Sequence, residues 1–250
     1  AQMLDLALID GELWAAGSGA SGSNRGVLRL AGSAWAGTNW VLSGTNLSVG
    51  ADETGIYSGP YTKTPTGWTL TTGAPQSIAD LALIDGRMYG LAETAFGSSG
   101  MFSAVGRLEN GAWQRVGVGL LPSPVFSSFS GAVTRYSGDV VAGRAFSLNS
   151  VLLRTARFTG ARWRSLDGDV GGVPAFESST PGARVSVLKE HDGVLWVGGV
   201  FNGSSTGASP YLARFQGVAP VIGQALVDVS ACAGAEAQFS VQTLPVPGLE

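Results

Sequence analysis

The chain has 250 residues, 44% of them hydrophobic and 13% charged, and a formal net charge of −3. This hydrophobic content excludes an intrinsically disordered chain, and the length suits one all-β domain. With only two lysines and scattered arginines, we expect no nucleic-acid partner, because a phosphate backbone requires clustered cations. No apolar run approaches the roughly 20 residues of a membrane helix, and the first residues lack the pattern of a signal peptide, so we expect no membrane insertion.

The first predicted hairpin joins the apolar runs 4–9 and 13–17 through Asp10-Gly11. Asp-Gly between apolar runs indicates a type I′ turn, which needs positive φ at both central residues. The signal returns, in full or weaker form, at four further places: Thr54-Gly55, Asp85-Gly86, Ser137-Gly138 and Asp192-Gly193. The five turn glycines are separated by 44, 31, 52 and 55 residues, which is typical of repeats that each form a four-stranded blade.

Each hairpin is followed by further strand signals. Third strands combine Arg with an apolar residue, at Arg29-Leu30, Arg107-Leu108, Arg157-Phe158 and Arg214-Phe215. Fourth strands are predicted to begin with a tryptophan, at Trp40, Trp68, Trp113 and Trp163. Trp113 and Trp163 could stack on sugars, but a residue that recurs at one position of a repeat is more often packed between blades. We therefore expect both to be buried, and no helical periodicity competes with the strand pattern.

The repeats predict an all-β fold, a β-propeller of about five four-stranded antiparallel blades. The blades are placed at 3–43, 45–73, 77–119, 127–170 and 184–217, so that residues 1–220 form the propeller and residues 221–250 a C-terminal tail. The fifth repeat has no closing tryptophan at the expected spacing, which indicates a missing or degenerate outer strand. We therefore expect either a fragment of a larger propeller that extends upstream, or ring closure by residues 221–229.

The repeat is most regular from Asp192 to Phe201, DGVLWVGGVF, and from Tyr211 to Gly217, YLARFQG. These residues resemble bacterial β-propeller repeats with the blade shape of kelch and galactose-oxidase-type propellers. The resemblance covers roughly residues 3–217 and implies an extracellular or cell-surface module without catalytic residues. Residues 221–247 are similar to the first two strands of an immunoglobulin-like module, through the segment 229–241, although the partner cysteine and the core tryptophan of that fold are absent.

Few residues offer metal or redox chemistry. His191 is the only histidine and Cys232 the only cysteine, so we expect neither a transition-metal site nor a disulfide. The chain departs here from copper radical oxidases, which need several histidine and tyrosine ligands. We expect no cofactor, with Ca²⁺ as the one cation that the carboxylates of the 167–177 loop could hold.

Blade geometry indicates where a ligand would bind. The second-to-third loop of each blade and the connections between blades lie on one face, opposite the Asp-Gly turns, and functional residues gather on such loops. The candidate ligand-binding residues on this loop-rich face are Glu93, Arg144, Asp167, Asp169, Glu177 and Asn202. Simple solvation of these side chains is the alternative, and Asp167 and Asp169 could instead bond to the backbone of their own loop.

Two functions fit this pattern. The first is a noncatalytic binding or architectural module of a larger secreted or surface bacterial protein, which contacts protein or glycan through the loop-rich face. The alternative is a carbohydrate-active hydrolase or lyase that uses Asp167, Asp169 or Glu177 together with Arg144.

Overall fold

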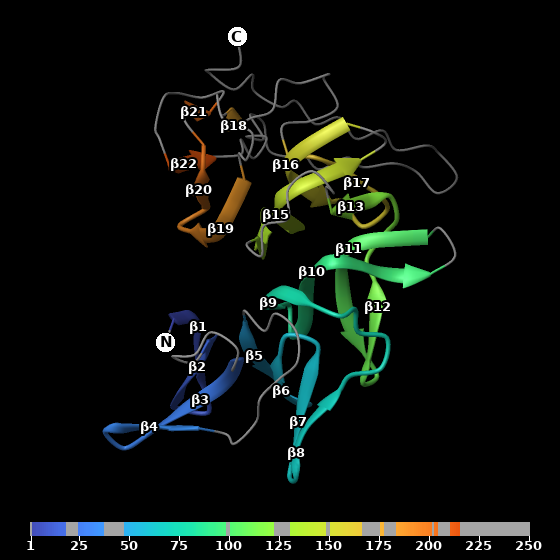
Figure 1. Cartoon of the computed structure of the whole chain (residues 1–250). Coiled ribbons are helices and arrows are strands. Elements are labelled where there is room, and N and C mark those ends of the chain that lie inside the picture. Colours follow the sequence, from blue (N-terminus) through green and yellow to red (C-terminus); the bar gives the residue numbers. More distant parts are fainter. Residues whose placement is uncertain are drawn as a thin grey trace, which may run out of the picture. The chain divides into compact units, whose positions relative to one another are not determined.

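The protein is an all-β propeller of five blades, as predicted (Figure 1). The computed structural model describes residues 2–18, 25–37, 48–98, 101–122, 131–148, 151–166, 176–177, 184–201, 203–204 and 211–215. The chain divides into two compact units, Ala1–Phe215 and Gln216–Glu250, and the second lies outside the described residues. The immunoglobulin-like tail therefore stays a prediction. No helix in the described ranges is long and apolar enough to cross a membrane.

The first three sheets each have four antiparallel strands in chain order. The first contains β1 (Gln2–Ile9), β2 (Glu12–Ser18), β3 (Arg25–Ala31) and β4 (Ala34–Gly37). The second contains β5 (Val49–Asp52), β6 (Gly55–Ser58), β7 (Tyr61–Thr64) and β8 (Gly67–Leu70). The third contains β9 (Ile78–Ile84), β10 (Arg87–Ser98), β11 (Met101–Glu109) and β12 (Ala112–Arg115).

The fourth and fifth sheets vary this pattern. The fourth contains β14 (Ala132–Tyr136), β15 (Asp139–Leu148), β16 (Val151–Phe158) and β17 (Trp163–Ser165), and β13 (Leu120–Pro122) pairs with the far end of β15. The fifth contains β19 (Arg184–His191), β20 (Val194–Val200) and β22 (Leu212–Phe215), which are three strands within the described part of the chain. A small separate pair joins β18 (Phe176–Glu177) to β21 (Gly203–Ser204).

Four of the five predicted hairpin turns have the expected backbone. Asp10 and Gly11 have φ values of 52° and 77°, and the turns at Asp85-Gly86, Ser137-Gly138 and Asp192-Gly193 also have both residues at positive φ. Such a backbone strains most residues, and glycine at the second position removes that strain.

The turn of the second sheet corrects the sequence prediction by one residue. Strand β5 ends at Asp52 and β6 begins at Gly55, so the turn consists of Glu53-Thr54 and not Thr54-Gly55. The cause is Asp52, whose Oδ1 accepts hydrogen bonds from Thr54 N at 2.8 Å, Thr54 Oγ1 at 2.7 Å and Gly55 N at 3.2 Å. The Asp52 side chain thus closes this turn, whereas the other four hairpins are closed by a backbone with positive φ.

The fourth strand of the first sheet also lies elsewhere than predicted. It is β4, with Trp35 at its second position, whereas Trp40 lies outside the described residues. Trp35 follows Arg29 by six residues, the same interval that separates Arg107 from Trp113 and Arg157 from Trp163. The constant interval of six residues between the arginine and the tryptophan indicates the position of the fourth strand, because a short hairpin loop keeps the spacing between its two strands constant.

Neighbouring sheets pack face to face through the tryptophans of their fourth strands, as predicted for Trp113 and Trp163. Trp68 of the second sheet is buried against Ile9 and Trp14 of the first, and Trp113 of the third is buried in a cluster with Tyr57 of the second. Trp163 of the fourth sheet is buried against the third, where its Nε1 donates to the Val116 carbonyl at 2.7 Å. The bond satisfies the indole N–H in an apolar interior.

Glycine allows the fourth and fifth sheets to approach closely. A Cβ at Gly143 of β15 would lie 2.4 Å from Cγ1 of Val185 in β19. Val185 is fully buried there beside Leu188 and Leu195. A larger residue at position 143 would therefore separate the two sheets.

Side-chain oxygens also tie the first strands of successive sheets together. Asp5 Oδ2 accepts from Val49 N at 2.8 Å, Ser48 Oγ accepts from Leu81 N at 2.8 Å, and Asp80 Oδ2 accepts from Val133 N at 2.7 Å. Each bond satisfies an amide at an interface between sheets.

Burial raises the pKa of Asp80 to about 7. Hydrogen bonds from the Val133 and Leu81 amides oppose the shift, and the charge of Asp5 adds to it. Because the folded-state pKa lies above the unfolded value of 3.8, folding takes up a proton between these values. The stabilisation that protonation supplies is complete below about pH 4 and is lost as the pH rises through about 7.

We predict that Asp80→Asn reduces the pH dependence of stability. Asparagine keeps an acceptor for Val133 N without the charge, so the variant should lose less stability than the parent between pH 5 and pH 8. The parent's loss from this group is on the order of 2 kcal/mol, at about 1.4 kcal/mol per pKa unit. Urea titrations at both pH values measure it, with Asp10→Asn in an exposed turn as the control. Equal pH dependence in the parent and Asp80→Asn would contradict the burial argument.

A second prediction compares two equivalent tryptophans. Trp113→Ala should lower the free energy of unfolding by about 3 to 5 kcal/mol, as a large truncation in a core does. Trp35→Ala, at the same position of the first sheet but 40% exposed, should cost less than about 2 kcal/mol. Denaturant unfolding of both variants at low protein concentration gives the comparison, and similar losses would show that the second-to-third interface does not depend on the indole.

Candidate functional site

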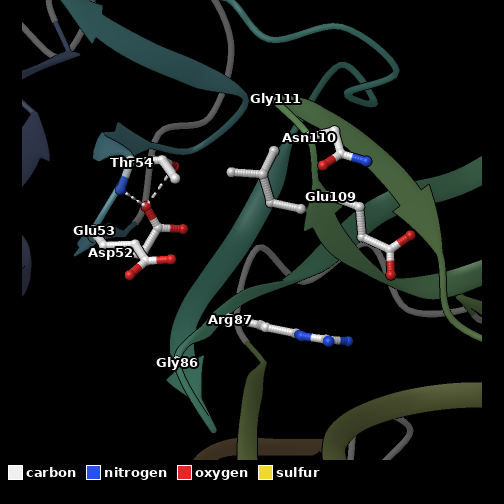
Figure 2. A pocket seen from close by; sticks show the side chains of 9 residues that line it. Asp52, Glu53, Thr54, Gly86, Arg87, Glu109, Asn110 and Gly111 are labelled. Atoms are coloured by element: carbon white, nitrogen blue, oxygen red, sulfur yellow. Dashed lines mark hydrogen bonds between the residues drawn. The ribbon is translucent and has the colours of Figure 1, made fainter.

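A groove of about 420 Å³ lies between the second and third sheets, on the side of the molecule that carries the hairpin turns. We call it the Asp52 groove. Its lining residues are Asp52, Glu53, Thr54, Gly86, Arg87, Leu108, Glu109, Asn110 and Gly111. Figure 2 shows Asp52 and Glu53 on one side of it, and Arg87, Glu109 and Asn110 on the other. The volume falls within the range of small-ligand sites.

The wall formed by the second sheet is held by a network of hydrogen bonds. The three bonds that close the Glu53-Thr54 turn use Asp52 Oδ1, which also lies 3.4 Å from the Tyr57 hydroxyl. The Thr54 and Tyr57 hydroxyls are 2.6 Å apart. Burial raises the pKa of Tyr57; the hydrogen bond to Thr54 opposes this, and the charge of Asp52 adds to it. The wall therefore presents Asp52 in a fixed orientation.

The opposite wall comes from two hairpins of the third sheet. Gly86 and Arg87 belong to the β9–β10 hairpin, and Asn110 and Gly111, with φ values of 49° and 75°, form the β11–β12 turn. Leu108 supplies a buried apolar surface between them. Glu109 forms an ion pair with Arg107, which restrains its carboxylate.

Several polar groups in this groove are available to a ligand. Glu53, Arg87 and Asn110 are exposed, and none of their side chains bonds to another residue within the described ranges. Together they offer a carboxylate, a guanidinium and an amide, so the groove combines acceptors with donors.

A second groove, of about 490 Å³, lies between the third and fourth sheets, and we call it the Tyr89 groove. Its lining residues are Ile84, Asp85, Tyr89, Arg107, Arg115, Val116, Gly117, Gly138, Asp139, Val140, Phe158, Thr159 and Gly160. The Arg107 guanidinium lies over the Tyr89 ring, 5.9 Å from its centroid. Arg135 forms an ion pair with Asp85, with 2.6 Å between Nη1 and Oδ1, and Arg157 Nη1 lies 3.9 Å from Asp139 Oδ2.

The two grooves are built from equivalent positions of successive repeats. Gly86, Leu108 and Asn110 in the first correspond to Gly138, Phe158 and Gly160 in the second. The charged positions differ, because Arg87 corresponds to Asp139 and Glu109 to Thr159. The scaffold therefore repeats the shape while the lining changes from groove to groove.

Of the six sequence-predicted ligand residues, only Arg144 has a described side chain. It is 4% exposed, and its Nη1 donates to the Ala92 carbonyl of the third sheet at 3.1 Å. Glu93 in β10 and Glu177 in β18 have described backbones only, and Asp167, Asp169 and Asn202 lie outside the described residues. A role of these six residues in ligand binding stays a prediction.

The other predicted chemistry can be placed only in part. His191 ends β19 with an exposed side chain, 3.4 Å from Asp192. Within the described ranges no three His, Cys, Asp or Glu side chains gather in a way that could hold a metal ion. Most of the 167–177 loop considered for Ca²⁺ lies outside those ranges, so the calcium site stays a prediction.

Sequence reasoning missed both grooves because it treated their residues as turn formers. The turns favour Asp, Asn and Gly for their backbone geometry, so the presence of these residues gives no separate indication that they also line a groove. A signal was present at the first residue after each turn glycine, which is Arg87 in one repeat and Asp139 in another. A position that changes charge between repeats is not explained by turn chemistry alone.

Comparisons with known proteins identify no family for this chain. No protein-family model matches the chain, and no curated protein does. A solved structure described as "Structure of YjhT" is similar, with 11% sequence identity, coverage of 78% of this chain and 70% of that chain, and a TM-score of 0.41.

We predict that Arg144→Ala destabilises the protein. The substitution removes a donor to the Ala92 carbonyl and leaves a space between the third and fourth sheets, which should cost roughly 1 to 3 kcal/mol. Arg135→Ala, which removes an exposed ion pair with Asp85, should cost less than about 1 kcal/mol. Thermal unfolding of the two variants tests this, and an unchanged melting temperature for Arg144→Ala would mean that the buried contact contributes nothing.

Proposed function

We propose that the chain is a noncatalytic binding module of a larger secreted or surface bacterial protein, and that the Asp52 groove holds part of a glycan. The supporting observation is that equivalent positions of successive repeats form two grooves of similar size whose polar linings differ. A scaffold that keeps a concave shape and varies the side chains around it is suited to recognition.

The hydrogen bonds of the groove favour binding over catalysis. A glycosidic acid must release a proton to the leaving oxygen, and its partner carboxylate must face the reacting carbon. Asp52 is instead committed to the turn through Oδ1, and Glu109 is paired with Arg107. These two carboxylates are thus restrained by contacts within the protein, and Glu53 alone does not supply the pair of carboxylates that the reaction needs.

The available groups suit hydroxyl-rich ligands. A sugar hydroxyl donates one hydrogen bond and accepts others, so neighbouring hydroxyls are bound best where acceptors and donors alternate. Glu53 accepts, Arg87 donates, and the amide of Asn110 does both. Leu108 offers an apolar surface for the carbon face of a sugar ring.

The loop-rich face predicted from the sequence is a second place where the module could contact glycan or protein. That part of the proposal rests on the sequence pattern alone. The hydrolase or lyase alternative rests on the same loops, through Asp167, Asp169 and Glu177. The enzyme alternative differs from the binding module in one observable, which is the release of shortened glycan products.

The experiment is a screen of neutral and charged oligosaccharides, followed by calorimetric titration of the best ligand. We expect Glu53→Gln and Asn110→Gly each to weaken the affinity roughly tenfold, because each removes a hydrogen bond at a desolvated contact. Asn110→Gly suits the test because glycine keeps the positive φ of the turn.

Thr159→Ala in the Tyr89 groove is the control and should leave the affinity unchanged. If neither Glu53→Gln nor Asn110→Gly changes the affinity, the glycan does not bind in the Asp52 groove. Shortened products in the mixture after long incubation would overturn the noncatalytic proposal.

A further inference from the structure

The charges that line the Asp52 groove do not balance. Three carboxylates line it, from Asp52, Glu53 and Glu109, and one guanidinium, from Arg87. The ion pair with Arg107 offsets the charge of Glu109. Two carboxylates and one guanidinium remain, so the groove carries an excess of negative charge.

The negative charge is concentrated on one wall. Figure 2 shows the Arg87 guanidinium pointing away from Asp52 and Glu53, and the Glu109 carboxylate also points away from them. The groups that lie across the groove from these two carboxylates include the amide of Asn110 and the side chain of Leu108, which are both neutral. The wall of the second sheet therefore attracts a cation that the groove itself does not supply.

Both carboxylates on this wall have oxygens left for a ligand. The hydrogen bonds of Asp52 to its own hairpin all use Oδ1, and within the described part of the chain Oδ2 accepts none. Glu53 is exposed, and its side chain bonds to no other residue in those ranges. Because the hairpin already holds Asp52 in place, this carboxylate loses little conformational freedom when a ligand binds.

We propose that the Asp52 groove selects a glycan that carries a free amino group, bound as an ammonium by the carboxylates of Asp52 and Glu53. This inference rests on the proposed glycan-binding function and names the class of sugar. An ammonium donates three hydrogen bonds, and bonds between ionised partners are roughly twice as strong as neutral ones. An acetylated amine has lost this charge, and an acidic sugar is repelled by the same wall.

Calorimetric titration with two matched ligands tests this selectivity. The probes are a β-1,4-linked trimer of glucosamine and its fully N-acetylated form, at about pH 6, where the amines of the first trimer are protonated. We expect the parent to bind the amine form roughly tenfold more tightly, as a charge-assisted hydrogen bond allows. Raising the salt concentration should reduce this preference, because the carboxylates lie in an open groove.

Three variants separate the contributions. Glu53→Gln keeps the shape and removes one charge, so the preference for the amine form should fall to about threefold or less. Asn110→Gly should weaken both trimers alike and leave their ratio unchanged. Glu12→Gln is the matched control, because it removes an equal charge from an exposed position of the first sheet and should change neither affinity.

The outcomes distinguish this inference from the function on which it rests. If both trimers bind equally well and both are weakened by Asn110→Gly, the groove binds glycan and the selectivity for an amine is wrong. If neither trimer binds, or if Asn110→Gly changes neither affinity, the glycan site and the selectivity both fail. A preference that Glu12→Gln reduces as much as Glu53→Gln would arise from the overall charge of the protein, and it would also overturn the proposal.

Discussion

The fold depends on one constraint, which is that the apolar face of a sheet is buried only where a neighbouring sheet covers it. A single four-stranded sheet cannot bury either face by itself. Here an aromatic or branched residue on the second strand covers the following sheet, and a tryptophan on the fourth strand covers the preceding one. Neighbouring repeats therefore share their buried clusters.

The same packing produces the grooves. Two twisted sheets pressed together at their middle diverge toward their turns, and the space between them is lined by whatever residues the turns carry. Turn residues are chosen first for backbone geometry, as Asn110 and Gly111 illustrate. Charged residues such as Glu53, in the β5–β6 turn, and Arg87, directly after Gly86, are exposed and do not belong to the core. Their chemistry can therefore vary between repeats at little cost to stability.

The sequence predicted the fold well because its strongest signals are local. The Asp10-Gly11 and Asp85-Gly86 pairs predict turns from two residues alone, and a tryptophan recurs in the fourth strand of successive repeats. Asp52 misled the prediction because a side-chain hydrogen bond closed a turn that the Thr54-Gly55 pair did not.

The candidate site depends on which turn faces which neighbour, and this information is not local. Nothing near Glu53 in the sequence indicates that Arg87 and Asn110 lie across a groove from it. Arg144 shows the converse, since blade geometry predicted it on the loop-rich face, while the structure buries its side chain, which donates to the Ala92 carbonyl.

The oxygens that tie the first strands together also explain why the repeats cannot be identical. Asp5 and Asp80 are close enough for the charge of one to raise the pKa of the other, and Ser48 performs the same task between them without a charge. A carboxylate in every blade would bring further like charges close to one another at the contacts between first strands, as Asp5 and Asp80 already are. Divergence at this position therefore relieves an electrostatic conflict that perfect sequence symmetry would create.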